Sequence, residues 1–430
     1  MKKIICIPLI AAALSCLASC GKQADNQSVL EITGIGISGE CGFISEFQAK
    51  NPDIKVVLND YSDDAAPDTG IKRLGASIAS ENGGDIVIFN RFLDADNFID
   101  KGMLMDLNEL DCIKERKDDI LPNIIESYEK DGKMYSMTTG FNIYTFACKA
   151  DTISAEDWNI NDFCSTAAPF IKNGDDLFAN HSQSCYEQMF YDLAASSGSA
   201  EYVQNNFDKL TAMLDSMKEM LNISNSIGNF NFAESCYADD TVLFNDTYIG
   251  SFDTYYTLKK LYFNDEINLL GTPAEESTLR IAPEIEFAVM NDAKNKEAAE
   301  KFISFYLSDE YQTSNMLSGY YFPVISSVLD KEYEHTLSDK LYDQNDNVVG
   351  DKENIEFIGN QKVDIGIPSE DDIREMYDIV RSVKGIEKTD AVIYSIVSEK
   401  INDFWSGAIS SEDYLSEVID KLNTYYSEQN

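Results

Sequence analysis

In the first part of the chain, short apolar runs alternate with stretches of helical period, and this alternation predicts strand and helix in turn. The strands are expected at 29–37, 54–58 and 85–89, and the helices around Phe43 and Phe47, at 71–80 and at 95–101. The run at 85–89 is almost continuously apolar, which is typical of a central parallel strand covered on both faces. The pattern therefore predicts an α/β body with a parallel sheet.

A second pattern begins at the Asp131-Gly132 pair, which predicts a tight turn because glycine takes the positive φ that such turns need. Two strands are expected after it, a short one and a long one, separated by a break of small polar residues. A long strand broken in this way can leave one packed body and enter another. Phe141, Asn142 and Tyr144 would then lie at a junction between domains, where ligand clefts tend to form.

The second half of the sequence is richer in helical patterns, beginning with 155–221. Further strands are expected at 241–244, 266–270 and 285–289, an aromatic turn at 319–323, and a polar loop at 343–354. A strongly amphipathic helix opens at Asn295, with Ala298, Phe302 and Tyr306 on one face. The remainder of the chain is predicted to be helical.

Length and charge narrow the functional classes. A chain of 430 residues favours two domains over a single core. Its hydrophobic share of 44% and charged share of 25% are those of a folded globular protein. The formal net charge of −41 disfavours nucleic-acid binding and docking on anionic lipid through a basic patch. It suits a neutral or cationic ligand, although solubility alone also explains such a charge.

The first twenty residues have the pattern of an export signal. Lys2 and Lys3 precede an apolar run at 4–17, which is too short to span a membrane. Residues 17–21 read Leu-Ala-Ser-Cys-Gly and resemble a bacterial lipoprotein signal, in which Cys20 is diacylated and becomes the new N-terminus. The rest of the chain is then expected to be held at the outer membrane face by acyl chains alone. An ordinary signal peptide is the alternative.

Cysteine and histidine usage disfavours metal and triad chemistry. Six cysteines remain beyond Cys20; they form no Cys-x-x-Cys pair, and sequence cannot choose among their fifteen possible disulfide pairings. Only two histidines are present, without a zinc-protease motif, so a zinc hydrolase or a Ser/His/Asp triad is poorly supported. A glycosidase carboxylate pair stays open among the 75 acidic residues.

Two further motifs have a simpler explanation. Residues 34–39 spell GxGxxG after a strand, and we interpret them as a strand end and helix start bordering a cleft rather than as a dinucleotide site. Residues 343–354 resemble a calcium loop at positions 1, 3 and 5. Val348 and Asn354 stand where that loop needs Gly and Glu, so we expect no calcium site.

Several segments, in their order and spacing, resemble the bacterial family 1 extracellular solute-binding proteins, which are receptors of ABC importers. The matching segments are 43–52 with Ile54 and Val56, 84–87, 101–107, 131–135, 296–303 with Leu307 and Ser308, Gly319 with Pro323, and the tail from Ile401 through Gly407 to Ser411. The sequence departs from the family at Thr138, where a Pro is usual, and near 240, where the family's small-residue motif is not recognisable.

The resemblance implies a two-lobed periplasmic-binding-protein-like fold of type II, each lobe a mainly parallel sheet flanked by helices. The predicted division is a signal peptide at 1–19, a tether at 20–28, one lobe from 29–143 plus 272–308, and another from 144–271 plus 309–430. Ligand would be trapped between the lobes as they close.

Sugar capture needs flat aromatics for the apolar sugar faces and amide or carboxyl groups for the hydroxyls. Aligned with the family, Asn142 takes the place of a ligand-contacting acid and Phe89 that of a cleft aromatic. The expected ligand-binding residues are Phe89, Asn90, Arg91, Phe141, Asn142, Tyr144, Phe252, Tyr255, Tyr320 and Tyr321.

The function predicted from the resemblance is a lipid-anchored receptor on the extracytoplasmic face of the membrane. It would deliver a carbohydrate, expected to be an oligosaccharide, to the permease of an ABC importer by hinge closure. We expect a monomer with no catalytic residue, metal or cofactor. The alternatives are a surface carbohydrate-active hydrolase and a ligand-binding module for a sensor kinase.

Overall fold

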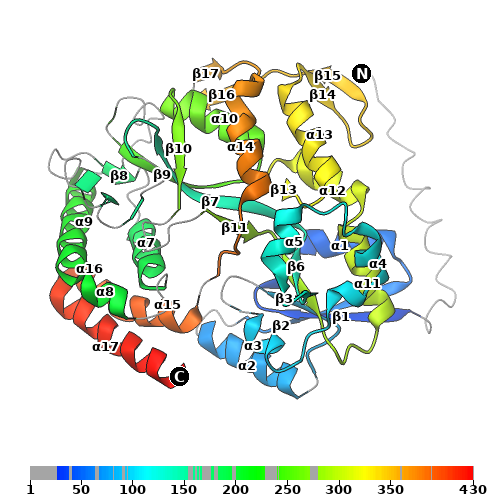
Figure 1. Cartoon of the computed structure of the whole chain (residues 1–430), viewed down its shortest axis with the longest axis horizontal. Helices are drawn as coiled ribbons and strands as arrows, with labels where there is room; N and C mark the ends of the chain where they lie inside the picture. Colours follow the sequence, from blue (N-terminus) through cyan, green and yellow to red (C-terminus); the bar gives the residue numbers. More distant parts are fainter. Residues whose placement is uncertain are drawn as a thin grey trace, which may run out of the picture.

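The fold is built around two β-sheets, each covered by helices (Figure 1). The computed structural model describes residues 27–429, except 38–40, 63–66, 81, 90–92, 94, 154–157, 160, 161, 164, 167–175, 179–182, 196–199, 228–239, 241, 272–278, 359, 360 and 389. The predicted signal peptide and most of the tether, with Cys20, therefore lie outside the described residues.

The first sheet has five strands in the order β2-β1-β3-β12-β6. Their bounds are β1 Ser28–Gly34, β2 Ile54–Asp60, β3 Ile86–Phe89, β6 Met137–Thr138 and β12 Glu286–Val289. β1 runs parallel to β2 and β3, as the strand–helix alternation predicts, whereas β12 runs antiparallel to β3 and β6. All four residues of β3 are buried, which confirms its prediction as a covered central strand.

Helices from two separate stretches of the chain lie around this sheet (Figure 1). They are α1 Cys41–Lys50, α2 Pro67–Ala79, α3 Asp96–Ile99, η2 Leu107–Glu109, α4 Asp111–Arg116, α5 Pro122–Tyr128, α11 Lys296–Tyr306 and α12 Asp309–Ser318. The predicted face of α11 is confirmed, because Ala298, Phe302 and Tyr306 are buried and the Asn295 side chain caps the helix. Phe302 meets Phe47 of α1 with ring centroids 5.2 Å apart.

The second sheet is organised on one long strand, β7 Gly140–Lys149. Its other strands are β8 Asp176–Phe178, β9 Val242–Ile249, β10 Ile267–Leu270, β11 Arg280–Pro283 and β13 Phe322–Pro323. β9, β10, β11 and β13 all run antiparallel to β7, whereas β8 pairs in parallel with β9. The two-lobed α/β fold is thus confirmed, but this sheet is mixed rather than mainly parallel, because strands from distant parts of the chain pair with β7 in the antiparallel direction.

Alternate residues of β7 enter different hydrophobic cores. Phe141, Ile143 and Ala147 belong to the larger core, whereas Phe146 and Cys148 belong to a second one. On the side of the larger core lie α10 Phe252–Thr257, η3 Leu258–Phe263, α13 Ser326–Leu337 and α14 Glu370–Ser382. The second core is covered by α7 Gln183–Ala195, α8 Glu201–Asn205, α9 Phe207–Ile227, α15 Ala391–Ser398, α16 Ile401–Ser406 and α17 Ser411–Gln429.

Three two-stranded antiparallel sheets complete the described part of the fold. Their strands are β4 Glu129–Lys130 with β5 Lys133–Met134, β14 Lys340–Tyr342 with β15 Val348–Asp351, and β16 Ile355–Ile358 with β17 Gln361–Asp364. The Asp131-Gly132 turn is confirmed, since both residues have positive φ. The predicted polar loop at 343–354 is only partly a loop, because β15 forms within it. The Asp343 carboxylate accepts from the backbone of Asn345 and Asn347, at 2.8 and 2.9 Å, and so closes a turn.

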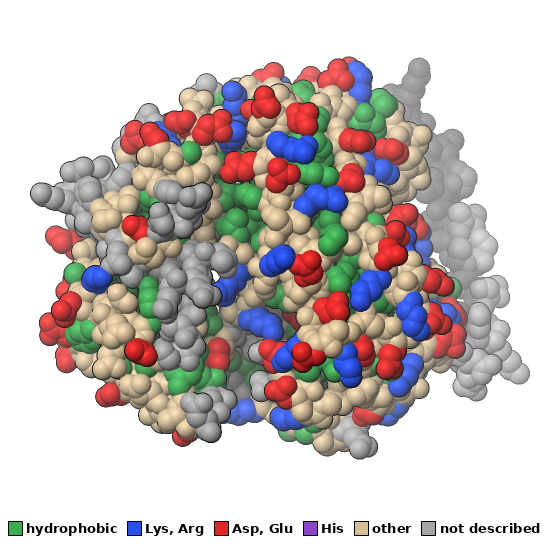
Figure 2. Space-filling model, viewed as in Figure 1, with side chains coloured by type: hydrophobic (Ala, Val, Ile, Leu, Met, Phe, Trp, Pro, Cys, Tyr) green, Lys and Arg blue, Asp and Glu red, His purple; other side chains and the backbone are tan. Residues whose placement is uncertain are grey.

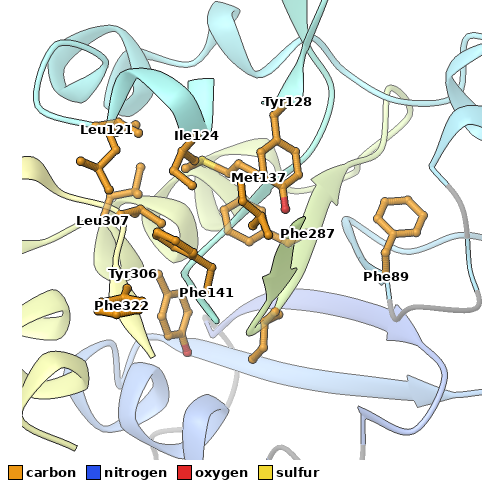
Figure 3. Packing of buried hydrophobic residues seen from close by; sticks show 14 of the residues in the cluster. Phe89, Leu121, Ile124, Tyr128, Met137, Phe141, Phe287, Tyr306, Leu307 and Phe322 are labelled. Atoms are coloured by element: carbon orange, nitrogen blue, oxygen red, sulfur yellow. The ribbon is translucent and has the colours of Figure 1, made fainter. Parts of the chain in front are cut away.

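The chain passes from one sheet to the other at three places. At Thr139 it leaves β6 in the first sheet and enters β7 in the second, which confirms the predicted break between a short and a long strand. The second passage lies between β11 and β12, and the third runs through α12 into β13. Figure 3 shows the apolar packing around these passages, where Phe141 and Phe322 have ring centroids 5.8 Å apart.

Two further observations concern anchoring and cysteines. Within the described part of the chain, no helix is both long and apolar enough to cross a membrane.

Cys112 and Cys148 are buried free thiols, and burial raises the pKa of each to about 12, so neither is a reactive thiolate at neutral pH.

Candidate functional site

A cavity of about 430 Å³ lies between the two sheets, at the carboxyl ends of β1 and β3. It is lined by Ile35, Gly36, Ile37, Ile88, Phe89, Leu93, Ala95, Tyr248, Ala282, Pro283, Glu284, Ile285, Glu286, Glu387 and Lys388. In the space-filling view, the surface is hollowed between the part that carries the C-terminal helices and the part built on β1–β3 (Figure 2). Proteins of the α/β class tend to bind ligands at the carboxyl ends of their parallel strands.

One face of the second sheet contributes aromatic side chains to this region. Tyr144 of β7 stands directly opposite Tyr248 of β9, and their ring centroids are 4.8 Å apart. Tyr248 lines the cavity and keeps 44% of its surface exposed. Burial, followed by the nearby Asp246 carboxylate, raises the pKa of Tyr144 well above its ordinary value, so this phenol stays protonated. The two rings are tilted by 36° to each other and together form an apolar platform with polar edges.

Asn142 lies on the same face of β7, one strand repeat before Tyr144. Its Oδ1 atom is buried and has no hydrogen-bond partner within the described residues. Gly250, just beyond β9, lies beside it. A Cβ atom on Gly250 would come within 2.2 Å of Asn142 Oδ1 and 1.9 Å of the Tyr320 carbonyl oxygen. The backbone of Tyr320 can therefore lie this close to the face of the sheet because position 250 carries no side chain.

Two carboxylates near the β11–β12 passage, those of Glu284 and Glu286, line the cavity. Glu286 is buried, and its Oε1 accepts a hydrogen bond of 2.6 Å from Ser136 Oγ. Glu284 Oε2 accepts from Thr139 Oγ1 and from Asn315 Nδ2, both at 2.9 Å. Burial, followed by the charge of Glu286, raises the pKa of Tyr128 well above its usual range.

The segment between α14 and α15 adds one further charge of each sign. Its backbone is fixed to β11 by hydrogen bonds from Ile281 N to Gly385 O, at 2.9 Å, and from Glu387 N to Ile281 O, at 2.7 Å. Glu387 accepts a 3.4 Å hydrogen bond from the Tyr248 hydroxyl, and Lys388 lies 3.4 Å from an Asp96 carboxylate oxygen. Glu387 thus contacts a strand of the second sheet and Lys388 contacts α3 beside the first.

The structure separates the predicted ligand-binding residues into groups. Phe89 lines the cavity with little exposed surface, and Tyr144 supports Tyr248. Asn90 and Arg91 lie outside the described residues. The ligand-binding role of these residues stays a prediction.

The other predicted aromatics lie elsewhere. Phe141, Phe252 and Tyr255 have no exposed surface and pack in the larger core, so they support the fold rather than line the cavity. Tyr320 is 73% exposed, and neither it nor the half-buried Tyr321 lines the cavity.

Sequence reasoning missed the residues that the tertiary structure brings to the cavity, namely Tyr248, Glu284, Glu286, Glu387 and Lys388. Tyr248 could have been found only by pairing β9 with β7 in the observed register. Within the described residues, no group of three His, Cys, Asp or Glu side chains could hold a metal ion.

Solved structures with a similar fold are binding proteins. An ABC substrate-binding protein from Listeria monocytogenes in complex with cycloalternan is 17% identical, with a TM-score of 0.53 over 93% of this chain and 99% of that one. A chitin oligosaccharide binding protein is 13% identical, with a TM-score of 0.54 over 94% and 99%. A solute-binding protein in complex with raffinose is 14% identical, with a TM-score of 0.50 over 93% and 99%.

The sequence itself carries a family signature. No curated protein matches this sequence. Residues 42–340, more than half of the chain, match the family described as bacterial extracellular solute-binding protein. The members of that family bind solutes outside the cytoplasm, and a cavity between two sheets suits solute binding. This chain belongs to the bacterial extracellular solute-binding proteins.

Proposed function

We propose that the protein is a lipid-anchored receptor that binds a carbohydrate, specifically an oligosaccharide, and delivers it to an ABC importer. The observation that carries the proposal is the Tyr144–Tyr248 platform beside the carboxylates of the cavity. A pyranose ring has an apolar face that stacks on an aromatic ring and hydroxyls that donate to carboxylates. Three structurally similar proteins bind cycloalternan, chitin oligosaccharide and raffinose, which supports the same ligand class here.

The proposed mechanism is hinge closure without chemical change. One lobe would be built on the first sheet and the other on the second, which moves 140–143 and 280–283 from the first predicted lobe, 29–143 plus 272–308, to the second, 144–271 plus 309–430. A ligand that contacts the strand ends of the first sheet and Tyr248 of the second is fully bound only when the lobes are closed. It then shifts the balance of open and closed forms by its difference in affinity for the two. Micromolar affinity corresponds to about −8 kcal/mol, which one stacked ring and several hydrogen bonds can supply.

A thermal-shift screen tests the ligand class. Raffinose, maltotetraose and chitotetraose are compared with peptides and polyamines, and we expect a rise in melting temperature with at least one sugar. A rise with peptides or polyamines only would contradict the carbohydrate assignment and leave the receptor assignment standing.

The same samples test the absence of catalysis. After incubation with the three sugars we expect no new reducing ends and intact ligand by mass spectrometry. Release of reducing ends would contradict a pure receptor and favour a surface carbohydrate-active hydrolase.

A further inference from the structure

The three passages between the sheets meet at one carboxylate, that of Glu284. Glu284 itself lies on the second passage, between β11 and β12. Its Oε2 accepts from Thr139 Oγ1, on the first passage, and from Asn315 Nδ2 of α12, on the third, both at 2.9 Å. The Glu284 side chain therefore joins its own passage to the other two described passages.

Backbone hydrogen bonds run alongside these contacts. Glu284 N donates to Gly140 O at 2.9 Å, and Thr139 N donates to Ile285 O at 3.3 Å. The first two passages are thus paired backbone to backbone at the level where the carboxylate joins them. Gly140 leaves the space for that carboxylate, because a Cβ atom there would lie 2.7 Å from Glu284 Oε2 and 2.8 Å from Asn315 Nδ2.

A buried glutamine fixes the third passage to the same place. Gln312 of α12 has no exposed surface, and its amide group donates to Thr139 O at 2.7 Å and to Tyr306 O at 2.8 Å. Its carbonyl oxygen accepts from Val324 N at 2.9 Å. The three passages are therefore joined by a polar network in an otherwise apolar region, and polar groups there are costly to leave unpaired.

Glu284 also lines the cavity between the sheets, whereas Thr139, Gln312 and Asn315 do not. One group thus belongs to both the candidate ligand site and the connection about which the lobes would turn. We infer that Glu284 is a positioning residue with two effects. It fixes the position of one sheet relative to the other, and it makes the hinge respond directly to a ligand bound in the cavity. The second effect, the response to ligand, rests on the proposed carbohydrate function.

The inference is tested with substitutions that weaken the polar network at residues that do not line the cavity. Thr139→Val and Asn315→Leu each remove one donor to Glu284, and each is compared with the wild-type full chain. Hydrogen exchange, followed by mass spectrometry without ligand, reports the amides of Thr139 and Glu284. We expect exchange in peptides covering 137–141 and 282–286 to become at least fivefold faster. We also expect the Kd for whichever of raffinose, maltotetraose and chitotetraose binds to rise at least fivefold.

Glu387→Gln is the matched control, because Glu387 lines the same cavity and its carboxylate accepts from the Tyr248 hydroxyl. It should alter sugar affinity and leave exchange at 137–141 and 282–286 unchanged. Wild-type exchange in both Thr139→Val and Asn315→Leu would overturn the inference, as would wild-type sugar affinity in both.

The experiment separates the inference from the proposed function. If none of the three sugars binds the wild-type protein, the carbohydrate assignment fails. The inference is then decided by exchange without ligand, where faster exchange in the two variants supports the connecting role of Glu284 and unchanged exchange overturns it.

Discussion

Glu332 of α13 is a buried carboxyl group with no ion-pair partner among the described residues. Its Oε1 accepts from Phe252 N at 3.4 Å, and its Oε2 is buried with no hydrogen-bond partner in the described part of the chain. Burial raises the pKa of Glu332 well above its ordinary value, and the charge of Asp253 adds to the effect. The folded protein therefore keeps the Glu332 proton to a higher pH than the unfolded chain does.

This gives a pH dependence of defined sign. The folded state keeps the Glu332 proton at pH values where the unfolded chain has lost it, so stability falls as pH rises above the unfolded pKa of about 4.3. Glu332→Gln removes this loss, at ~1.4 kcal/mol per unit of pKa difference. We expect the variant's advantage in melting temperature over the wild type to grow from pH 5 to pH 7.5. An equal difference at the two pH values would contradict the assignment.

Tyr248 is the residue on which sugar stacking depends most directly. Tyr248→Ala removes the exposed half of the platform, and we expect it to cost about 1–2 kcal/mol of binding, roughly a factor of 5–30 in Kd. Tyr248→Phe keeps the ring and loses the hydrogen bond to Glu387, so it should bind closer to the wild type. Isothermal titration calorimetry measures both variants, and equal losses would assign the effect to the hydroxyl instead of the ring.

At the scale of elements, the C-terminal end of α14 is capped by a side chain from another helix. Asn123 of α5 is 2% exposed, and its Nδ2 donates to Val380 O and Val383 O, both at 2.9 Å. The last carbonyls of a helix have no partner within it, so this amide supplies what the helix lacks. It also joins α5, beside the first sheet, to a helix on the second.

Asn123→Ala should lower the free energy of unfolding by ~1–3 kcal/mol, because it leaves two buried carbonyls without donors. Lys384→Ala is the control. It removes an ion pair with Glu126 just beyond the same helix end, but the Lys384 side chain is 64% exposed. Exposed pairs contribute ~0–1 kcal/mol. Urea denaturation measures both, and a smaller loss for Asn123→Ala than for Lys384→Ala would refute the capping role.

Element patterns show what the sequence could predict and what it could not. The strands at 54–58 and 85–89, the face of α11 and the break before β7 follow from local periodicity, and all are observed. The direction of the strands beside β7 was missed, since antiparallel return depends on contacts between distant segments. The same reason explains Tyr248, whose place opposite Tyr144 depends on the register of two strands about a hundred residues apart in sequence.

At the scale of the whole molecule, the predicted anchor decides where the receptor works. Cys20→Ser removes the only thiol that the lipoprotein signal would acylate. We expect wild-type protein expressed in a bacterial host to sediment with membranes and to partition into detergent. The Cys20→Ser protein should lose both properties and keep its melting temperature in detergent-free buffer. Membrane association of the variant would contradict lipid anchoring through this residue.

The close approach at Gly250 has a consequence for divergence among homologues. A methyl group there would meet both the Asn142 amide and the Tyr320 carbonyl. Lineages in which position 250 has acquired a side chain should therefore show compensating changes, either a smaller residue at 142 or an altered length in the turn that carries 320. These three positions should vary as a set, although nearly two hundred residues separate the first from the last.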